Sequence, residues 1–442
     1  MIKLPEQVNK AICLLKNSGF EASAVGGAVR DCLLGKVPFD WDITTSARPE
    51  ETEKVFCGER IIETGIKHGT VTVIIDDMPL EITTYRIDGD YTDHRHPQTV
   101  SFSDNLRDDL SRRDFTINTL CCNCDDKIID AFGGKDDLKN KIIRCVGDPD
   151  TRFSEDALRI MRAVRFSAEL GFKIEKSTSD SILKNRQLLS DVSKERLQVE
   201  FTKLITGKYA TDVIRKYHAV IEVFIPELAP LVGCEQHTKY HKYDVFEHTL
   251  HAIDAIDFND RILRLTMFFH DFGKPDAKTT DENGTSHFKG HAVISEKKTR
   301  DILKRLKFDN NTINEVSKLV LIHDMKSPRD KIQAKKMMCS LGDEAYLNLI
   351  KIKRADNMAK ADPHAIDEKL KNMRSFYEEI KINNECYNLK SLAINGDDIK
   401  AFGIAEGKEI KSSLDFLLNG VIEGKCQNRK DVLLEYLKEN TK

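Results

Sequence analysis

Two patterns of hydrophobic and polar residues divide the chain. Residues 70–75 and 80–85 alternate between apolar and polar side chains, as half-buried strands do, and Asp-Asp-Met-Pro at 76–79 is typical of a hairpin turn. Residues 91–113 are polar and rich in Asp, Arg and His, which predicts a loop. From about Ser154 onward apolar residues recur at helical spacing. The sequence therefore predicts an α+β fold class, in which a head with a small mixed or antiparallel sheet precedes an all-helical body.

The composition is that of an ordinary globular protein. The chain has 442 residues, 40% of them hydrophobic and 32% charged, which suits about two to four domains. No uninterrupted apolar stretch is long enough to cross a bilayer, so we expect no membrane association. The eleven cysteines are scattered without paired C-x-x-C spacing, as is typical of reduced thiols. These features predict a cytoplasmic protein.

Charge is distributed unevenly along the chain. The net charge is −3, yet residues 182–217 hold eight Lys or Arg against four Asp or Glu. Phosphate binding depends on such a local excess rather than on the global charge. The segment fits an RNA-contacting surface and equally a solvated helix face, and charge alone does not decide between them.

The segment richest in candidate chemistry begins with two glycines. Gly26 and Gly27 open a predicted helix, where backbone N–H groups can approach a phosphate, and Arg30 adds a guanidinium fork one turn later. Asp40 and Asp42 are separated by one residue in a strand-like run, so both carboxylates project from one face. Carboxylates beside a phosphate cradle predict an Mg²⁺ site, and two ions there would activate an attacking hydroxyl and neutralise a leaving pyrophosphate.

This segment also carries a family resemblance. G-G-A-V-R-D followed by D-W-D is similar to the signature of class II tRNA nucleotidyltransferases and bacterial poly(A) polymerases. Further blocks follow in family order at residues 112–118, 132–138, 152–166 and 195–200. Together they cover roughly the first half of the chain, so coincidence is a poor explanation.

The resemblance implies a reaction and a set of partners. It implies template-independent addition of C, C and A to the 3′ end of tRNA from CTP and ATP, with release of pyrophosphate and Mg²⁺ held by Asp40 and Asp42. It also places Arg113, Arg162 and Arg165 at the phosphates and sugar of the nucleotide. The expected partners are tRNA, CTP and ATP, with no obligate protein partner.

A second block predicts how the base is chosen. On a helix, Asp156, Arg159 and Arg162 share one face. A carboxylate beside a guanidinium matches the amino donor and ring-nitrogen acceptor that cytosine and adenine share, whereas uracil and guanine present the opposite pattern. We therefore expect Asp156 and Arg159 to read the incoming base. The competing interpretation is a surface helix with Asp–Arg pairs.

The body contains a group of histidines and aspartates. His248, His270-Asp271 and Asp356 resemble the metal ligands of HD-superfamily phosphohydrolases, a family with an all-helical fold. Imidazole and carboxylate ligands suit Mn²⁺, Fe²⁺, Ni²⁺ or Zn²⁺. The resemblance places possible ligands of a second metal at His291 and His323. A degenerate spacer domain is the alternative, and hydrolysis of cyclic or terminal phosphates is left open.

The motif positions set soft domain boundaries. We expect a catalytic head at 1–150, a helical neck at 151–232, an HD-type domain at 233–375 and an RNA-contacting tail at 376–442. Three rival functions remain: a poly(A) polymerase, a partial A-adding or CC-adding enzyme, and an HD-type phosphohydrolase with an RNA-binding head. The polar stretch 91–110 favours full CCA addition, because the resembled family has a flexible element there.

Overall fold

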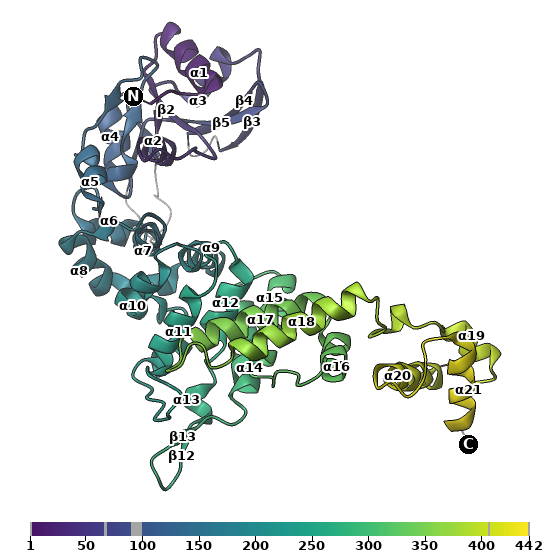
Figure 1. Cartoon of the computed structure of the whole chain (residues 1–442). Helices are drawn as coiled ribbons and strands as arrows, with labels where there is room; N and C mark the ends of the chain where they lie inside the picture. The colour runs from purple at the N-terminus through teal and green to yellow at the C-terminus, as the bar shows by residue number, and fades with distance from the viewer. Residues whose placement is uncertain (1, 66–68, 90–99, 405–406, 441–442) are drawn as a thin grey trace. The chain divides into compact units, whose positions relative to one another are not determined.

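The chain folds into two compact units. The computed structural model describes residues 2–65, 69–89, 100–404 and 407–440 (Figure 1). One unit comprises residues 1–229 with 305–307, and the other comprises residues 230–304 with 308–442. The finer predicted boundaries at 150 and 375 stay predictions. Among the described residues, no helix is both long enough and apolar enough to cross a membrane.

A seven-stranded mixed sheet forms the centre of the first unit. Its strands are β1 (Ala22–Val25), β2 (Asp42–Thr45), β3 (Arg60–Gly65), β4 (Thr70–Ile75), β5 (Met78–Thr84), β8 (Cys121–Cys122) and β9 (Ile128–Ile129). They lie in the order β3-β4-β5-β2-β1-β8-β9. Strands β2 and β5 are parallel, and the other neighbouring pairs are antiparallel. The predicted α+β fold class is therefore confirmed.

The hairpin of β4 and β5 forms where the alternation predicts it. Val71, Val73 and Ile75 are fully buried on one face of β4. The turn residues Asp76 and Asp77 have φ angles of 46° and 64°. Two consecutive positive φ angles suit the twist of a tight hairpin, and aspartate tolerates this conformation better than most residues.

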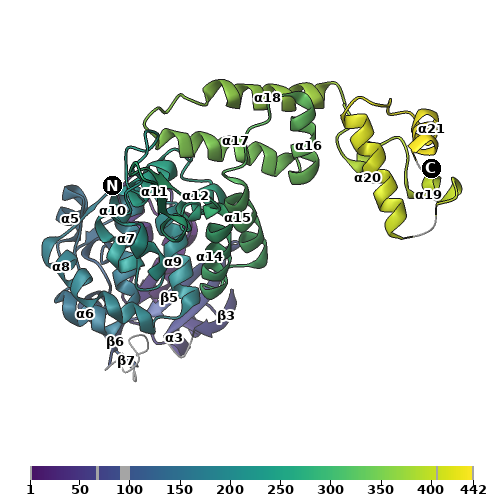
Figure 2. The same ribbon diagram turned by 90° about the horizontal axis from the view of Figure 1, so that it is seen from below.

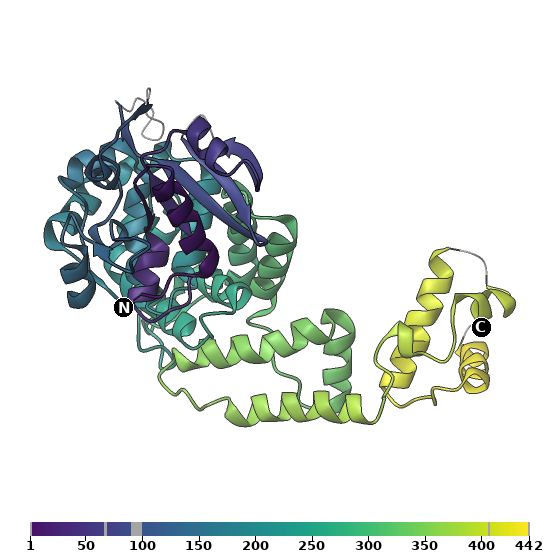
Figure 3. The same ribbon diagram turned by 90° about the horizontal axis from the view of Figure 1, so that it is seen from above.

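Helices pack around this sheet. They are α1 (Glu6–Asn17), α2 (Gly27–Leu33), α3 (Pro49–Val55), α4 (Leu106–Ser111) and α5 (Gly134–Asn140). Helix α1 buries Val8, Ile12 and Leu15, and it runs across the sheet beside β1 (Figure 3). This apolar stripe follows helical spacing, so the period of the sequence determines which face of α1 is buried.

The predicted loop at 91–113 is partly wrong. Residues 91–99 lie outside the described part of the chain, but β7 (Val100–Phe102) pairs with β6 (Arg86–Asp88), and α4 follows. The Asn105 side chain accepts the Arg107 N–H and caps α4. Its polar composition hides this short helix, because capping rather than apolar periodicity defines it.

The helical neck of the first unit follows the sheet. Its helices are α6 (Pro149–Glu155), α7 (Leu158–Leu170), α8 (Lys176–Asn185), α9 (Lys194–Ile205) and α10 (Ala210–Ile221), with short 3₁₀ turns η3 (Arg186–Asp191) and η4 (Pro226–Leu231), whereas the turn η2 (Thr116–Asn118) lies in the head between α4 and β8. A small pair, β10 (Ile142–Ile143) and β11 (Lys173–Ile174), lies beside α7. The predicted continuous helix through Asp156 is wrong: Asp156 is extended, with φ −133°, and separates α6 from α7.

The second unit is almost entirely helical (Figure 2). Its helices are α11 (Val245–Asp254), α12 (Arg261–Phe269), α13 (Lys274–Ala277), α14 (His291–Arg305), α15 (Asn310–Ile322), α16 (Lys331–Leu341), α17 (Asp343–Met358), α18 (Asp367–Ile382), α19 (Gly396–Ala401), α20 (Lys408–Ile422) and α21 (Lys430–Asn440). A small hairpin, β12 (Thr279–Thr280) with β13 (Ser286–His287), and a turn η5 (Leu389–Ser391) complete it. The last three helices share an apolar core that includes Ile399, Leu417 and Leu433.

Candidate functional site

Three carboxylates meet at the edge of the head sheet. Asp42 begins β2 and is in register with Glu81 of the parallel strand β5. Partial burial raises the pKa of Asp42 to about 6, and the negative charges of Glu81 and Asp40 act in the same direction. The positive charge of Arg113 lowers it, but by less. Carboxylates that disfavour one another's ionisation form a group that a bound cation would stabilise. Glu81 adds a third acidic group that the sequence pattern does not single out.

Gly26 lets an arginine approach this acidic edge. A Cβ atom at Gly26 would lie 3.3 Å from Nη1 of Arg113 and 3.9 Å from Oδ2 of Asp42, and Gly26 has a φ of 82°. Glycine therefore serves here both for its backbone conformation and for the space it leaves. Arg113 is held from behind by Asp109, whose buried carboxylate lies 3.3 Å from its Nη2 atom. The structure thus places the positively charged guanidinium of Arg113 beside the carboxylates, close to the start of α2.

A buried polar chain joins α2 to α7. Arg30 donates from Nη1 to Oδ1 of Asn118 at 2.8 Å, and Asn118 donates to Oδ1 of Asp114 at 3.0 Å. Asp114 in turn pairs with Arg162 of α7 at 2.6 Å. Burial alone would raise the pKa of Asp114, but Arg162 and two hydrogen-bond donors hold it at about 2. The chain fixes the head and the neck helix to each other at the predicted nucleotide site.

The predicted base-reading residues have partners other than each other. Arg159 pairs with Glu155 at 2.8 Å and donates to the Arg112 carbonyl at 2.7 Å. Asp156 pairs instead with Arg196 of α9 at 3.1 Å. The expected shared helix face is therefore corrected, since Asp156 lies in the break before α7. Its extended backbone and the Arg196 pair set its orientation.

Every arginine predicted at the nucleotide has an acidic partner. Besides the pairs of Arg113, Arg159 and Arg162, Arg30 lies 2.8 Å from Asp31, and Arg165 lies 2.6 Å from Glu200. Arg30, Arg162 and Arg165 also surround the ring of Phe166, with guanidinium carbons 4.0–5.3 Å from its centroid. Ion pairs and cation–π contacts restrict these long side chains before any ligand arrives.

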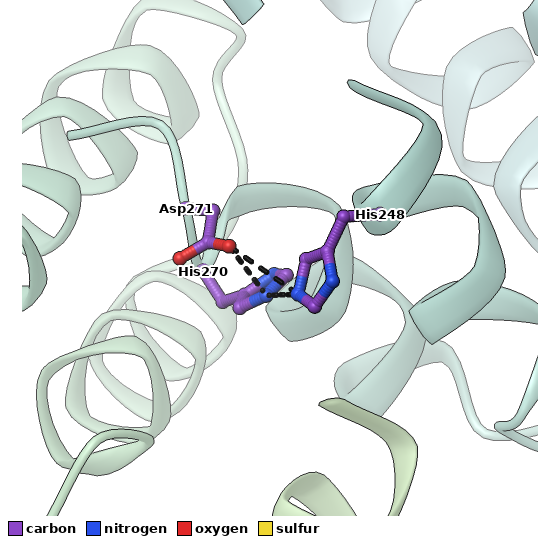
Figure 4. A group of neighbouring side chains, drawn as sticks. All are labelled: His248, His270 and Asp271. Atoms are coloured by element: carbon purple, nitrogen blue, oxygen red, sulfur yellow. Dashed lines mark hydrogen bonds and ion pairs between the residues drawn. The ribbon is translucent and has the colours of Figure 1, made fainter. Parts of the chain in front are cut away.

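The second unit brings the six predicted HD-type residues together. His248 on α11 and His270 at the end of α12 approach to 3.4 Å between their Nε2 atoms, and both face Oδ2 of Asp271 (Figure 4). On the other side of that carboxylate, His291 and His323 approach to 3.1 Å between their Nε2 atoms. Asp356 of α17 completes the group, with Oδ1 3.0 Å from Nε2 of His248.

Backbone carbonyls orient all four imidazoles. The Nδ1 atoms of His248, His270, His291 and His323 lie 2.6–3.2 Å from the carbonyl oxygens of Ala359, Met267, Phe288 and Val320. In a neutral imidazole with its proton on Nδ1 the lone pair is on Nε2, and all four Nε2 atoms point into the group. This is the arrangement by which proteins prepare histidine as a metal ligand.

Asp271 is shared between two possible metal positions. Its carboxylate belongs to one group with His248 and His270 and to another with His291 and His323. Gly273 permits the close approach of α14, because a Cβ there would lie 2.3 Å from the His291 carbonyl.

Burial and nearby carboxylates shift the pKa of three of these imidazoles, those of His248, His270 and His323. Burial lowers the pKa of His248, and it lowers that of His323 to about 3, so these two imidazoles are neutral. For His270 burial acts in the same direction, but Asp271 and Asp356 outweigh it and raise the pKa to about 9.

A basic cavity adjoins this group. It has a volume of about 440 Å³, and two of the six residues, His323 and Asp356, form part of its wall. Its remaining charged lining comprises Lys326, Arg329, Lys353, Lys360 and Lys369 with the single acid Asp324. Lys360 lies 2.6 Å from Asp356, so one of these cations contacts the predicted ligands directly. The cavity favours an anionic ligand.

Three segments of the chain match known protein families. Residues 22–144 match the poly(A) polymerase head domain, 171–231 the probable RNA- and SrmB-binding site of polymerase A, and 279–437 the putative domain 2 of tRNA nucleotidyltransferases. The CCA-adding enzyme of Bacillus velezensis is 34% identical over 96% of this chain and 95% of its own length. That of Geobacillus kaustophilus is 33% identical over 99% and 97%.

The chain belongs to the CCA-adding enzyme family. Its fold agrees with that of a solved member, the Bacillus stearothermophilus CCA-adding enzyme in complex with CTP. The TM-score is 0.76 and the identity 29%, over 99% of this chain and 97% of that one. The predicted resemblance to tRNA nucleotidyltransferases is therefore confirmed over nearly the whole chain rather than its first half alone, whereas these matches do not show the predicted HD-superfamily domain.

Two groups in this family member escape the sequence reasoning. Glu81 lies on an alternating strand, but its approach to Asp42 depends on the register of β2 and β5. Arg196 belongs to the block at residues 195–200, yet its partner Asp156 lies 40 residues earlier in the chain. Strand alternation predicts the face of the sheet on which Glu81 lies. No local pattern predicts that Glu81 lies near Asp42 or that Arg196 pairs with Asp156.

Proposed function

We propose that this chain adds C, C and A to the 3′ end of tRNA, taking CTP and ATP and releasing pyrophosphate. The observation that carries the proposal is the acidic edge of Asp42 and Glu81, with Arg113 brought beside it at Gly26. Carboxylates supply sites for cations, and the guanidinium supplies a site for phosphate. Nucleotidyl transfer needs a cation site and a phosphate site close to each other.

We assign Mg²⁺ to Asp40 and Asp42. The donors are oxygen atoms, and burial, with smaller contributions from Glu81 and Asp40, raises the pKa of Asp42, so a cation would offset the cost of its ionised form. Bound there, Mg²⁺ would lower the pKa of the attacking hydroxyl and stabilise the charge on pyrophosphate. Gly27 offers its backbone at the start of α2, and Arg30 and Arg113 offer guanidinium groups to the triphosphate.

In the proposed reaction, the 3′ oxygen of the RNA attacks the α-phosphorus of CTP or ATP. A new P–O bond forms, the anhydride bond to the β-phosphate breaks, and the hydroxyl proton leaves to solvent. Arg162 and Arg165 on α7 contact the sugar and phosphates and hold the nucleotide in line. The chain's own contribution is position and charge rather than a covalent intermediate.

Base choice is assigned to Asp156 and Arg159. The carboxylate accepts the amino group of cytosine or adenine, and the guanidinium donates to the adjacent ring nitrogen. Arg196 and Glu155 hold the two side chains in place. Uracil and guanine leave a buried carboxylate facing a carbonyl, which costs binding free energy.

A transcript of tRNA that ends before CCA tests this proposal. With CTP alone we expect two additions, with CTP and ATP three, and with UTP or GTP none. Asp42→Asn should abolish addition, because the amide cannot supply the negative charge that the metal needs. Asp301→Asn serves as the matched control, since Asp301 is an exposed carboxylate on α14, outside the head sheet and the basic segment 182–217. A long A tail with ATP alone would indicate a poly(A) polymerase instead.

A second function is favoured by the shared carboxylate Asp271. We infer that the two groups of three residues around it bind divalent transition ions, Mn²⁺, Ni²⁺, Fe²⁺ or Zn²⁺. Neutral imidazoles at His248 and His323 suit these metals, and the basic cavity beside them suits a phosphoester. A phosphohydrolase activity of the second unit is the corresponding proposal.

All eleven cysteines are free thiols, which supports a reducing compartment such as the cytoplasm.

A further inference from the structure

The loop that leads to the catalytic carboxylates exposes apolar side chains. Between α2 and β2, Val37 is 96% exposed and Phe39 is 103% exposed, more than any other large hydrophobic residue described. Leu33 at the end of α2 is 37% exposed. Single exposed apolar residues are common on protein surfaces, but an exposed aromatic ring next to a catalytic group is less easily ascribed to chance.

The backbone directs Phe39 outward. Trp41, two residues later, is only 6% exposed and lies in the core of the head. Strict strand alternation would send Phe39 to the same buried side, but the chain bends at Phe39 before β2 begins. The ring is thus held in solvent one residue before Asp40.

The other parts of the substrates already have assigned positions. The triphosphate is assigned to Gly27, Arg30 and Arg113, and the incoming base is assigned to Asp156 and Arg159. The attacking 3′ oxygen must lie at Asp40 and Asp42, so the last bases of the RNA acceptor must approach the neighbouring surface. That surface is the 33–39 loop, which also carries the exposed Lys36.

We propose that Phe39, with Val37 beside it, is a stacking platform for the terminal base of the RNA acceptor. This inference rests on the proposed CCA addition. The terminal base changes at each addition, first the base before CCA and then cytosine, so hydrogen-bond readout of one base would fail at the next step. An aromatic face stacks on any base, and Lys36 supplies charge for the adjacent phosphate.

Steady-state kinetics with a tRNA transcript that lacks CCA provide the first test. Phe39→Ala should raise KM for the transcript about tenfold, since one stacked base contributes about that much to binding, and leave KM for CTP within about twofold. Phe39→Tyr retains the ring and should behave as the wild type. Phe258→Ala is the matched control, because Phe258 is an aromatic residue that is 42% exposed between α11 and α12 of the other unit, outside the predicted RNA-contacting tail.

Fluorescence tests the stacking itself. A transcript whose last base is 2-aminopurine should lose emission when it binds to wild type or Phe39→Tyr, and keep it with Phe39→Ala. The platform would be overturned if the wild type adds C and A and Phe39→Ala shows the same quenching and the same KM for the transcript as the wild type. A rise in KM for CTP alone would overturn it too, because the ring would then contact the incoming nucleotide. Wild type that adds no nucleotide would refute the underlying reaction instead.

Discussion

The two residues proposed to read the base are each held in position by groups other than one another. Asp156 lies in the break between α6 and α7, where Arg196 binds both of its carboxylate oxygens at 3.1 and 3.3 Å and the Leu158 N–H donates to Oδ1 at 3.2 Å. Arg159 is restrained by Glu155 and by the Arg112 carbonyl. A site that distinguishes bases by one donor and one acceptor needs such restraint, because a mobile side chain would adapt to the wrong base.

Asp156→Asn should change which nucleotide is added. The amide offers a donor that can face the carbonyl of uracil, so the kcat/KM ratio of UTP to CTP should rise about tenfold or more, as one base contact contributes roughly 1–3 kcal/mol of discrimination. The measurement is kcat/KM for all four triphosphates on a tRNA without CCA. Asp150→Asn on α6 is the control, since Asp150 pairs with Lys184 at 2.5 Å away from α7. Equal losses for all four nucleotides would leave the residue a structural role only.

Between elements, one buried ion pair connects the head to α7. Asp114 follows α4 and Arg162 lies in the middle of α7, so their contact at 2.6 Å ties the two together. The pKa of Asp114 is about 2, below its ordinary value of 3.8, so its ionised form is the one that the fold stabilises. The pair should therefore contribute stability above pH 3.8 and lose that contribution as the pH falls towards 2.

Asp114→Asn should lower the free energy of unfolding by about 2–3 kcal/mol at pH 7. This is less than for a fully buried pair, because the Arg162 side chain is 34% exposed. Urea unfolding at pH 7 and pH 3 should show the difference between wild type and variant shrinking at the lower pH. Asp180→Asn removes an exposed pair with Lys176 and should leave the free energy of unfolding nearly unchanged at either pH. A loss that stays constant with pH would show that charge is not the cause.

The elements differ in how far the sequence predicts them. The β4–β5 hairpin follows directly from alternation and a turn, whereas of the two aspartates predicted on one strand face only Asp42 lies in a strand, because β2 begins there and Asp40 precedes it. The break at Asp156 does not follow, because helical spacing continues across it, and the Asp156 carboxylate is held both by Arg196 of α9 and by the Leu158 N–H. Local pattern thus predicts local structure, whereas the registers and long-range ion pairs that complete the site depend on tertiary packing.

Over the whole molecule, the two groups of chemical residues lie in different compact units. The carboxylates and arginines of the proposed transfer site lie in residues 1–229, and the six HD-type residues lie between residues 248 and 356. Their donor sets also differ: the first is formed by oxygen atoms, and the second is dominated by imidazole nitrogen. The two should therefore bind different metals and lose function separately.

His270→Ala combined with Asp271→Ala should remove bound transition metal and leave CCA addition within about twofold. Elemental analysis after supplementation with Ni²⁺ or Mn²⁺, together with nucleotide incorporation on the same preparations, measures both. His287→Ala is the control, because His287 is exposed and faces Asp281 at 2.9 Å outside the group. Wild type without metal after supplementation would mean that the second unit is a spacer, and joint loss of both properties would mean that the units are coupled.

The acidic partner beside each nucleotide-site arginine has a consequence for the choice of ligand. In the proposed site a triphosphate would meet guanidinium groups that are already ordered, so it would not need to immobilise them, and binding would become an exchange of carboxylate for phosphate. A single small anion would gain little from such an exchange, because it would replace a partner that is held in place by the fold. A ligand with several linked phosphates would displace several partners in one event. We therefore expect inorganic phosphate to compete poorly with a triphosphate for these arginines.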